Sequence, residues 1–289
     1  TAYFTEDSAL ENGYVEAIQT LNGWSNEGCT EPTLTLLRDM YASGTSLPLT
    51  GTLTLKGGTH TAKNVTVAEN ANVTFASGIY EGATINGTAT VKEGVTFTDA
   101  DVEVNGTLNV EGVTFNDPVE FKGSRIANIS GGTFTSDRVH GGVQFSNYSG
   151  TGTISGGTFV LAWFYTTKVK LSGGTFNDIV SSGDNTLAAL LAEGAAYYNG
   201  DSAVSDDNVS KLANVTVKSH KHNGGTDGKG ICSICNKQMA ASLTVGDNTS
   251  WYAAFATAIE AANAADGEKT ITLYQNVNGY AGGNSTTYE

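Results

Sequence analysis

Short segments in which apolar and polar residues alternate recur through the middle of the chain. Residues 86–97 read NGTATVKEGVTF, and residues 105–115 repeat this as NGTLNVEGVTF, 19 residues further on with one residue deleted. A tighter form, SGGTF, then occurs three times, at residues 130–134, 155–159 and 172–176. Similarity at a nearly fixed spacing indicates a repeat architecture.

The strands within each repeat are too short to bury an apolar face alone. Residues 89–91, 95–97 and 102–104 each alternate over three positions, with Gly-containing turns between them. If each strand stacks on its copy one turn later, every inward side chain becomes buried, at about 4.8 Å per rung. The motif phenylalanines would then form an internal ladder: Phe75, Phe97, Phe115, Phe134, Phe159 and Phe176.

These patterns predict an all-β fold with minor helix: a right-handed parallel β-helix (solenoid) with helical caps and a small zinc-knuckle-like segment. A left-handed hexapeptide helix would need a strict six-residue period, which is missing. A β-sandwich is the alternative, because the Asn-Gly pairs at 86–87 and 105–106 suit hairpin turns. Sandwiches, however, seldom repeat one string at one offset.

Two helices are expected to cover the open ends of the solenoid. Residues 8–21 place Tyr14, Ala17, Ile18 and Leu21 on one apolar stripe. Residues 184–198 (DNTLAALLAEGAAYY) offer polar N-cap candidates and a C-terminal Gly194.

The end of the chain resembles its beginning. Residues 255–277 align with residues 14–40, so that TITLYQNV matches TLTLLRDM. We therefore expect the chain to be an excerpt of a longer secreted protein built from tandem repeats, with neighbouring repeats in contact. The predicted segments are a capping helix and first strand (1–40), the β-helix (41–183), a capping helix and linker (184–219), a Cys/His knuckle (220–240) and the start of the next repeat (241–289).

The overall charge restricts the class of partner. The net charge is −14 and the pI is about 4.6, whereas nucleic-acid binding needs a basic surface. No apolar run reaches the 18 residues of a membrane span, so no membrane insertion is expected within this segment.

Four potential metal ligands lie within 16 residues. The segment HKHNGGTDGKGICSIC contains His220, His222, Cys232 and Cys235. Zinc takes four nitrogen or sulfur ligands tetrahedrally, and four protein ligands leave no position for a reacting water. We therefore expect a structural zinc ion. The alternative is a Cys232–Cys235 disulfide with the histidines uninvolved.

A longer rung between residues 134 and 159 suggests a ligand surface, because insertions in solenoids project from one face. Trp, Tyr and Arg dominate binding hot spots. The candidate contact residues are Arg138, His140, Tyr148, Trp163, Phe164 and Tyr165. Alternate members of the Trp163–Tyr165 run are expected to point into the core instead.

Aspartates that follow the ladder phenylalanines suggest a second function. Asp99, Asp117, Asp137 and Asp178 could form a file of carboxylates that binds Ca²⁺ or serves a polysaccharide hydrolase or lyase. Turn chemistry explains the same positions without catalysis, so we predict that the chain is not an enzyme. A passive spacer in a stalk is the third alternative.

Taken together, the SGGTF strings, the LLAEGAAYY segment, the HxH…CxxC cluster and the Ala-Ile helix restart resemble a module family. It occurs in large surface proteins of Gram-positive gut and oral anaerobes. The resemblance implies an extracellular, surface-attached adhesin that binds a host protein, such as an immunoglobulin in a superantigen-like manner, or a mucosal glycoprotein. In that family Cys-x-His often replaces the His220-x-His222 found here.

Overall fold

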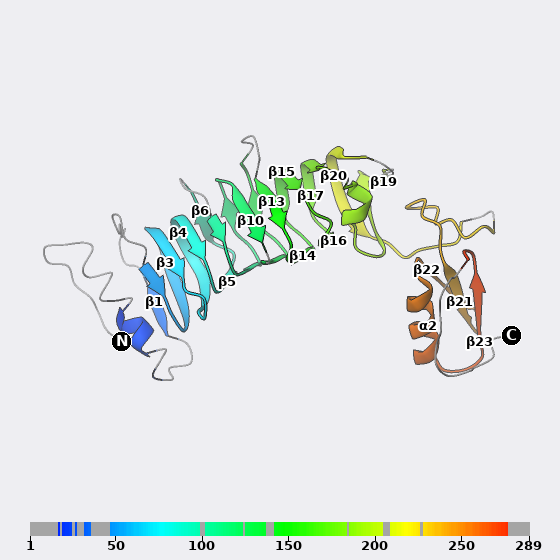
Figure 1. Ribbon diagram of the computed structural model, residues 1–289, viewed down its shortest axis with the longest axis horizontal. Helices are drawn as coiled ribbons and strands as arrows, with labels where there is room; N and C mark the ends of the chain where they lie inside the picture. Colours follow the sequence, from blue (N-terminus) through cyan, green and yellow to red (C-terminus); the bar gives the residue numbers. More distant parts are fainter. Residues whose placement is uncertain are drawn as a thin grey trace, which may run out of the picture.

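The computed structural model describes residues 17, 19–24, 27, 32–35 and 47–276, apart from 99–101, 124, 137–141, 184, 205–208 and 226–227. Within this part, twenty strands join into one continuous sheet that coils as a parallel β-solenoid, seen as a stack of rungs in Figure 1. The predicted fold class is confirmed. The β-sandwich alternative is wrong, because neighbouring strands in the repeats pair in parallel.

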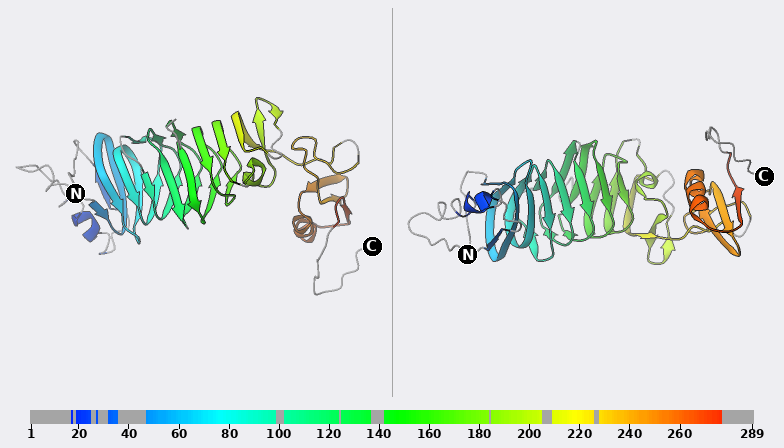
Figure 2. Two further views of the ribbon diagram at one scale, coloured as in Figure 1. Left: turned by 45° about the horizontal axis from the view of Figure 1, so that its top comes forward. Right: turned by 90° about the horizontal axis from the view of Figure 1, so that it is seen from below.

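Each rung contributes to three faces, and Figure 2 shows the faces from two further directions. The first face begins with the long strands β3 (Thr52–Val67) and β4 (Asn72–Ile85). It continues through β5 (Thr88–Val91), β8 (Thr107–Val110), β11 (Ile126–Ile129), β14 (Thr151–Ile154) and β16 (Val169–Leu171).

The other two faces follow the same order. The second face contains β6 (Val95–Phe97), β9 (Thr114–Phe115), β12 (Thr133–Phe134) and the first halves of β15 (Thr158–Phe164) and β17 (Thr175–Ser181). The third face contains β2 (Leu47–Leu49), β7 (Val102–Val104), β10 (Val119–Gly123), β13 (Val143–Tyr148) and the second halves of β15 and β17.

A column of phenylalanines fills the interior behind the second face. The rings of Phe97, Phe115, Phe134, Phe159 and Phe176 stack with centroids 4.7 to 5.1 Å apart. All five side chains are buried. Alternation within each strand causes this arrangement, because the threonine before each phenylalanine points outward. The predicted ladder is confirmed for these residues.

Phe75 does not belong to the column, so that part of the prediction is wrong. It lies on the first face, between Leu55 and Val91, while Tyr80 pairs with Phe97 on the second face. The long strand β4 serves all three faces in succession, so Phe75 comes one face earlier than the spacing suggested. Its ring still contacts Phe97 edge-on, with centroids 5.8 Å apart.

The N-terminal end is covered by a helical segment at residues 19–24 and by β1 (Thr33–Thr35). Leu21 joins the solenoid core, and the Asn22 side-chain oxygen accepts a hydrogen bond from the Thr50 backbone N–H at 2.9 Å. β1 pairs in parallel with β3, Thr33 opposite Thr54. Tyr14 and Ile18, placed on the same helix by the sequence, lie outside the described residues.

The predicted helix at residues 184–198 is wrong. The segment contains a single 3₁₀ turn, η1 (Leu187–Leu190), followed by strand β18 (Ala195–Asn199). Leu191 instead forms a parallel bridge with Leu171, so pairing with the open edge of the last rung prevails over helix propensity. Leu187 and Leu190 are buried over the core, where the i, i+3 spacing of a 3₁₀ turn aligns them.

Antiparallel strands complete this cap. β20 (Lys211–Ser219) pairs antiparallel with β17, and β18 covers the outer edge of β20. A short strand, β19 (Ser202–Ala203), pairs with β18. The change from parallel to antiparallel pairing therefore ends the stack of rungs.

A separate C-terminal unit follows. Strands β21 (Ala241–Val245), β22 (Asn248–Tyr252) and β23 (Lys269–Leu273) form an antiparallel sheet against which α2 (Phe255–Ala264) packs. The predicted helix and strand are present, whereas the β21–β22 hairpin was not foreseen. No helix in the described ranges is long and apolar enough to cross a membrane.

Candidate functional site

Between the solenoid and the C-terminal unit, four side chains converge on one point. His220 Nε2 lies 3.2 Å from His222 Nδ1 and 3.7 Å from Cys232 Sγ. Cys235 Sγ lies 3.7 Å from His222 Nδ1. All four potential ligand atoms are within 4.8 Å of one another.

These separations suit a tetrahedral metal ion. Zinc–nitrogen bonds of about 2.0–2.1 Å and zinc–sulfur bonds of about 2.3 Å place tetrahedral ligand atoms roughly 3.3 to 3.8 Å apart. The nitrogen–nitrogen distance of 3.2 Å and the two nitrogen–sulfur distances of 3.7 Å lie within about 0.2 Å of that range. The widest separation in the group, up to 4.8 Å, is about 1 Å longer, so a bound ion would draw the ligand atoms together. Both thiols are free, so the geometry is that of a dithiol and not of a disulfide. The group could therefore hold one metal ion with no position left open.

The local backbone explains why the two cysteines face the histidines. The Cys232 N–H donates to Lys237 O, and the Asn236 N–H donates back to Cys232 O, which closes a tight turn. Asn236 adopts the left-handed conformation, with φ 55°, which Asn tolerates better than most residues. The CxxC pair is thus presented from one compact loop.

Asn223 connects this loop to the histidine segment. Its side-chain oxygen accepts hydrogen bonds from the backbone N–H of Ser233 at 2.9 Å and from the Ser233 hydroxyl at 3.1 Å. The sequence interpretation missed this residue, although it directly follows the HxH motif. Asn223 is therefore a positioning residue for the cluster.

The surroundings of His220 and His222 favour the neutral form of both imidazole rings, which is the form that can bind a metal ion. Burial lowers the pKa of His220, and the nearby positive charges of His222 and Lys237 lower it further. Burial, followed by the charge of Lys237, also lowers the pKa of His222. Both rings are consequently neutral at neutral pH, which is the state that binds a metal ion.

The two thiols differ from each other. Burial alone raises the pKa of Cys232, but backbone hydrogen bonds from Asn223, Cys235 and Ile234 outweigh it, so the pKa falls below its ordinary value. For Cys235, burial raises the pKa to about 11. Of the two thiols, Cys232 therefore loses its proton more readily, and a bound cation would favour the thiolate form of both.

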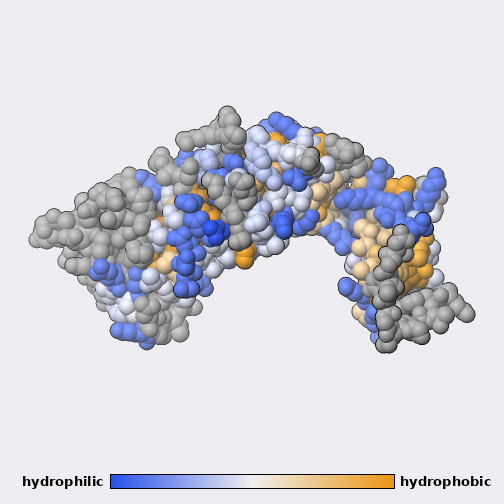
Figure 3. Space-filling view, in the orientation of Figure 1, coloured by the Kyte–Doolittle hydropathy of each residue, from blue (hydrophilic) through white to orange (hydrophobic). Residues whose placement is uncertain are grey.

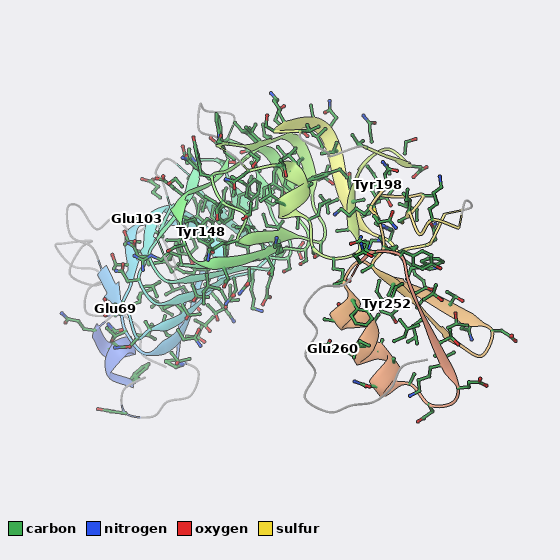
Figure 4. All side chains as sticks on the ribbon, turned by 45° about the vertical axis from the view of Figure 1, so that its right-hand side comes forward. Glu69, Glu103, Tyr148, Tyr198, Tyr252 and Glu260 are labelled. Carbon is green, nitrogen blue, oxygen red and sulfur yellow. The ribbon has the colours of Figure 1, made fainter. Side chains whose placement is uncertain are left out.

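Contacts on both sides fix the cluster between the two units. The His220 N–H donates to Gly194 O at 2.6 Å, which attaches the knuckle to the solenoid cap. On the other side, Gly224 lies against Trp251, so closely that a Cβ would fall 2.0 Å from the indole ring. Figure 4 labels Tyr198 on the solenoid side and Tyr252 in the C-terminal unit.

The second candidate site, the predicted contact surface, is only partly exposed. Phe164 is fully buried, stacked on Phe145 with centroids 5.1 Å apart. Tyr148 is 5% exposed, and its hydroxyl donates to backbone oxygens of Arg125 and Thr151. The prediction that Phe164 and Tyr148 belong to the contact surface is therefore wrong, because both occupy inward positions on their strands and pack in the core. Figure 4 labels Tyr148 within the body of the solenoid.

Trp163 and Tyr165 point outward from the end of β15. Their rings are nearly parallel, with centroids 5.9 Å apart and an angle of 6° between planes. Tyr165 is 39% exposed, and the indole N–H of Trp163 donates to Ser182 Oγ at 2.5 Å. The pair is therefore held in one orientation at the surface. Arg138 and His140 lie outside the described residues.

Of the four aspartates in the predicted file, the structure describes only Asp117 and Asp178, and these two do not lie together. Asp117 follows Phe115, and Asp178 follows Phe176, which lies three rungs later. Three rungs separate these positions by roughly 14 Å, whereas paired glycosidase carboxylates lie about 5–9.5 Å apart. Asp178 instead pairs with Lys211 at 3.0 Å. Asp99 and Asp137 lie outside the described residues.

Comparisons of the chain with protein-family models, with curated proteins and with solved structures find no match.

Proposed function

We propose that the chain is a non-catalytic binding module that presents an aromatic contact surface to a protein partner. The observation that carries this proposal is the oriented, partly exposed Trp163–Tyr165 pair on the outer side of β15. Tryptophan and tyrosine dominate the energetics of protein interfaces, and anchors that are already ordered lose little entropy on binding. The solenoid supplies the rigidity, since Phe164 between them is locked in the core.

The proposed partner is a host protein, with an immunoglobulin as the first candidate and a mucosal glycoprotein as the second. This choice rests on the resemblance to surface modules of gut and oral anaerobes, which also implies an extracellular, surface-attached location. The net charge of −14 supports a protein partner over a nucleic acid.

Two alternatives receive less support. A polysaccharide hydrolase or lyase would need neighbouring carboxylates, and the two predicted carboxylates within the described residues, Asp117 and Asp178, are three rungs apart and do not form such a pair. A passive spacer would have no reason to hold an exposed Trp–Tyr pair in one orientation by a hydrogen bond to Ser182.

We further propose that the four-residue cluster binds zinc and that the ion is structural. The donor set of two imidazoles and two thiolates is one that zinc prefers. With four protein ligands, no water or substrate can reach the ion. Its role would be to stabilise residues 220–240, whose described part (220–225 and 228–240) has almost no regular secondary structure.

Binding to immobilised human immunoglobulin tests the main proposal. We expect the double variant Trp163→Ala/Tyr165→Ala to bind about tenfold or more weakly than the wild type, because each ring is a hot-spot candidate. The matched control is Trp24→Ala, which removes an exposed tryptophan at the opposite end of the solenoid. Equal affinity of all three proteins, or no binding by the wild type to immunoglobulin or to mucosal glycoproteins, would contradict the proposal.

A further inference from the structure

The two ends of the structure contain equivalent elements in equivalent environments. The N-terminal helical segment (residues 17 and 19–24) aligns with α2 at an offset of 241 residues. The matching residues are buried in both helices: Ala17 corresponds to Ala258, and Leu21 corresponds to Ala262. The following strands also correspond. Thr33–Thr35 in β1 and residues 270–272 in β23 share the same pattern, in which only the middle residue is partly buried.

These equivalent strands use opposite edges for pairing. Pro32 O, just before β1, accepts from the Thr54 N–H, whereas the Tyr274 N–H, just after β23, donates to Ala240 O. Positions 32 and 34 therefore face the solenoid, but their equivalents 269 and 271 face away from β21. β1 pairs in parallel with β3 of the solenoid, Thr33 opposite Thr54 and Leu34 opposite Leu55. β23 pairs antiparallel with β21, Ile271 opposite Leu243. The same kind of strand therefore has a solenoid on one edge at the start of the chain and a hairpin sheet on one edge at its end.

We propose that the open edge of β23 is a docking surface for the first rung of a second copy of this solenoid that lacks its own residues 1–40, so that its β3 edge is free of β1. In that junction β23 takes the place of β1, so Thr270 lies opposite Thr54 of the second copy, in parallel. The β22–β21–β23 sheet then continues without a break into the second solenoid. Addition of a strand to an open sheet edge is a common mode of recognition, because backbone hydrogen bonds supply the affinity.

Surface chemistry around β23 suits this occupant. Among the described residues, β23 is the edge strand of its sheet, and Leu273 is 50% exposed. Figure 3 shows hydrophobic residues gathered on the face of the C-terminal unit that contains α2. Edge strands that carry exposed apolar residues are normally covered in native proteins.

A side-chain contact identifies the occupant more specifically. Asn22 accepts a hydrogen bond from the Thr50 N–H at the start of the solenoid. The alignment places Asn263 at the corresponding position of α2, and Asn263 is exposed. In the proposed junction, Asn263 accepts the same hydrogen bond from Thr50 of the second copy. Because the contact is head-to-tail, it permits a linear array and not a closed dimer.

A tandem chain tests the proposal. Residues 1–277 are joined directly to residues 41–289, so that the second solenoid has only α2 and β23 to cover its first rung. The control joins residues 1–254 to residues 14–289, which restores the natural helix and β1. Hydrogen exchange followed by mass spectrometry should give one protected population for solenoid peptides in both chains. Two equal populations in the tandem chain alone, one of them fully exchanged, would overturn the proposal.

The pairing register supplies a second test in the same tandem chain. Thr270→Cys combined with Thr54→Cys in the second solenoid should form a disulfide, because paired strands place the two Cα atoms about 4.8 Å apart. The off-register combination Thr272→Cys with the same Thr54→Cys separates them by about 8 Å and should not. Peptide mapping distinguishes these disulfides from any at Cys232 and Cys235. Failure of the first pair, or equal yield from the second, would overturn the proposal. Neither test depends on immunoglobulin binding or on zinc.

Discussion

Inward side chains of the solenoid contact their own counterparts in the rungs before and after them. In the second-face column, Phe134 stacks on both Phe115 and Phe159, with centroids 4.8 and 4.7 Å away. Outward neighbours have no such role: Thr133 is exposed on the same strand. The consequence of a substitution therefore depends on which side of the strand it lies.

At Phe134 we expect replacement by alanine to lower the free energy of unfolding by about 3–5 kcal/mol, because the change removes two ring contacts and leaves a cavity. Thr133→Ala should change it by about 0.5 kcal/mol or less. Equilibrium unfolding in guanidinium chloride, monitored by circular dichroism, measures both values. Similar costs at the two positions would show that the column does not exist in solution.

The Gly-Gly turn is the element that allows the rungs to stack. A Cβ on Gly156 would lie 2.2 Å from Ser130 O of the preceding rung, and one on Gly173 would lie 2.0 Å from Ser155 O. The second glycine of each turn has positive φ, 97° at Gly157 and 107° at Gly174. Close backbone approach therefore requires the first glycine, and backbone conformation favours the second.

Gly156→Ala should consequently be severely destabilising, by about 3 kcal/mol or more, because the backbone of two rungs must separate. A useful comparison is Gly183→Ala, where φ is 76° but no atom lies within 4 Å of the added Cβ. Strain alone should limit that cost to about 1–2 kcal/mol. Thermal unfolding of both variants checks the order, and an equal or reversed order would exclude the steric explanation.

The repeats made the solenoid predictable because identical strings at similar offsets must occupy identical environments. The position of Phe75 was predicted wrongly because β4 is one long strand that passes through all three faces. The rungs that follow, from β5 to β13, are divided into short strands, one for each face, which the motif spacing follows. The helix predicted at residues 184–198 is wrong for a different reason. An Ala/Leu-rich string suits a helix, but Leu191 pairs with the open strand edge at Leu171, a partner that the local sequence does not reveal. At the His/Cys cluster, the spacing in the sequence was sufficient to identify the four side chains that converge. Asn223 is recognised only through its contact with Ser233, ten residues further along the chain.

At the scale of the whole molecule, the cluster lies where the solenoid meets the C-terminal unit. It is attached to the solenoid cap through Gly194. On the other side, Trp251 and Tyr274, whose rings lie 4.9 Å apart, lie against Gly224 and Gly230 of the same segment. A metal ion at this point would stabilise the connection between the two units. The solenoid itself has a continuous core that includes none of these ligands.

Purified protein should therefore contain about one zinc ion per chain by elemental analysis. Cys232→Ser should lose most of it, because three ligands remain, while Cys29→Ser serves as the control for loss of a thiol elsewhere. Chelation should increase proteolysis within residues 220–240 and leave the solenoid resistant. Metal-free protein with a Cys232–Cys235 disulfide would contradict the zinc assignment.

Hydroxyl-radical footprinting of the complex with immunoglobulin is the sharpest test of the proposed function, because it measures the oxidation of solvent-exposed aromatic side chains one residue at a time. Immunoglobulin at a saturating concentration should strongly reduce oxidation of Trp163 and Tyr165, while oxidation of Trp24 remains unchanged. Unchanged oxidation of Trp163 and Tyr165 in a complex that demonstrably forms would contradict it.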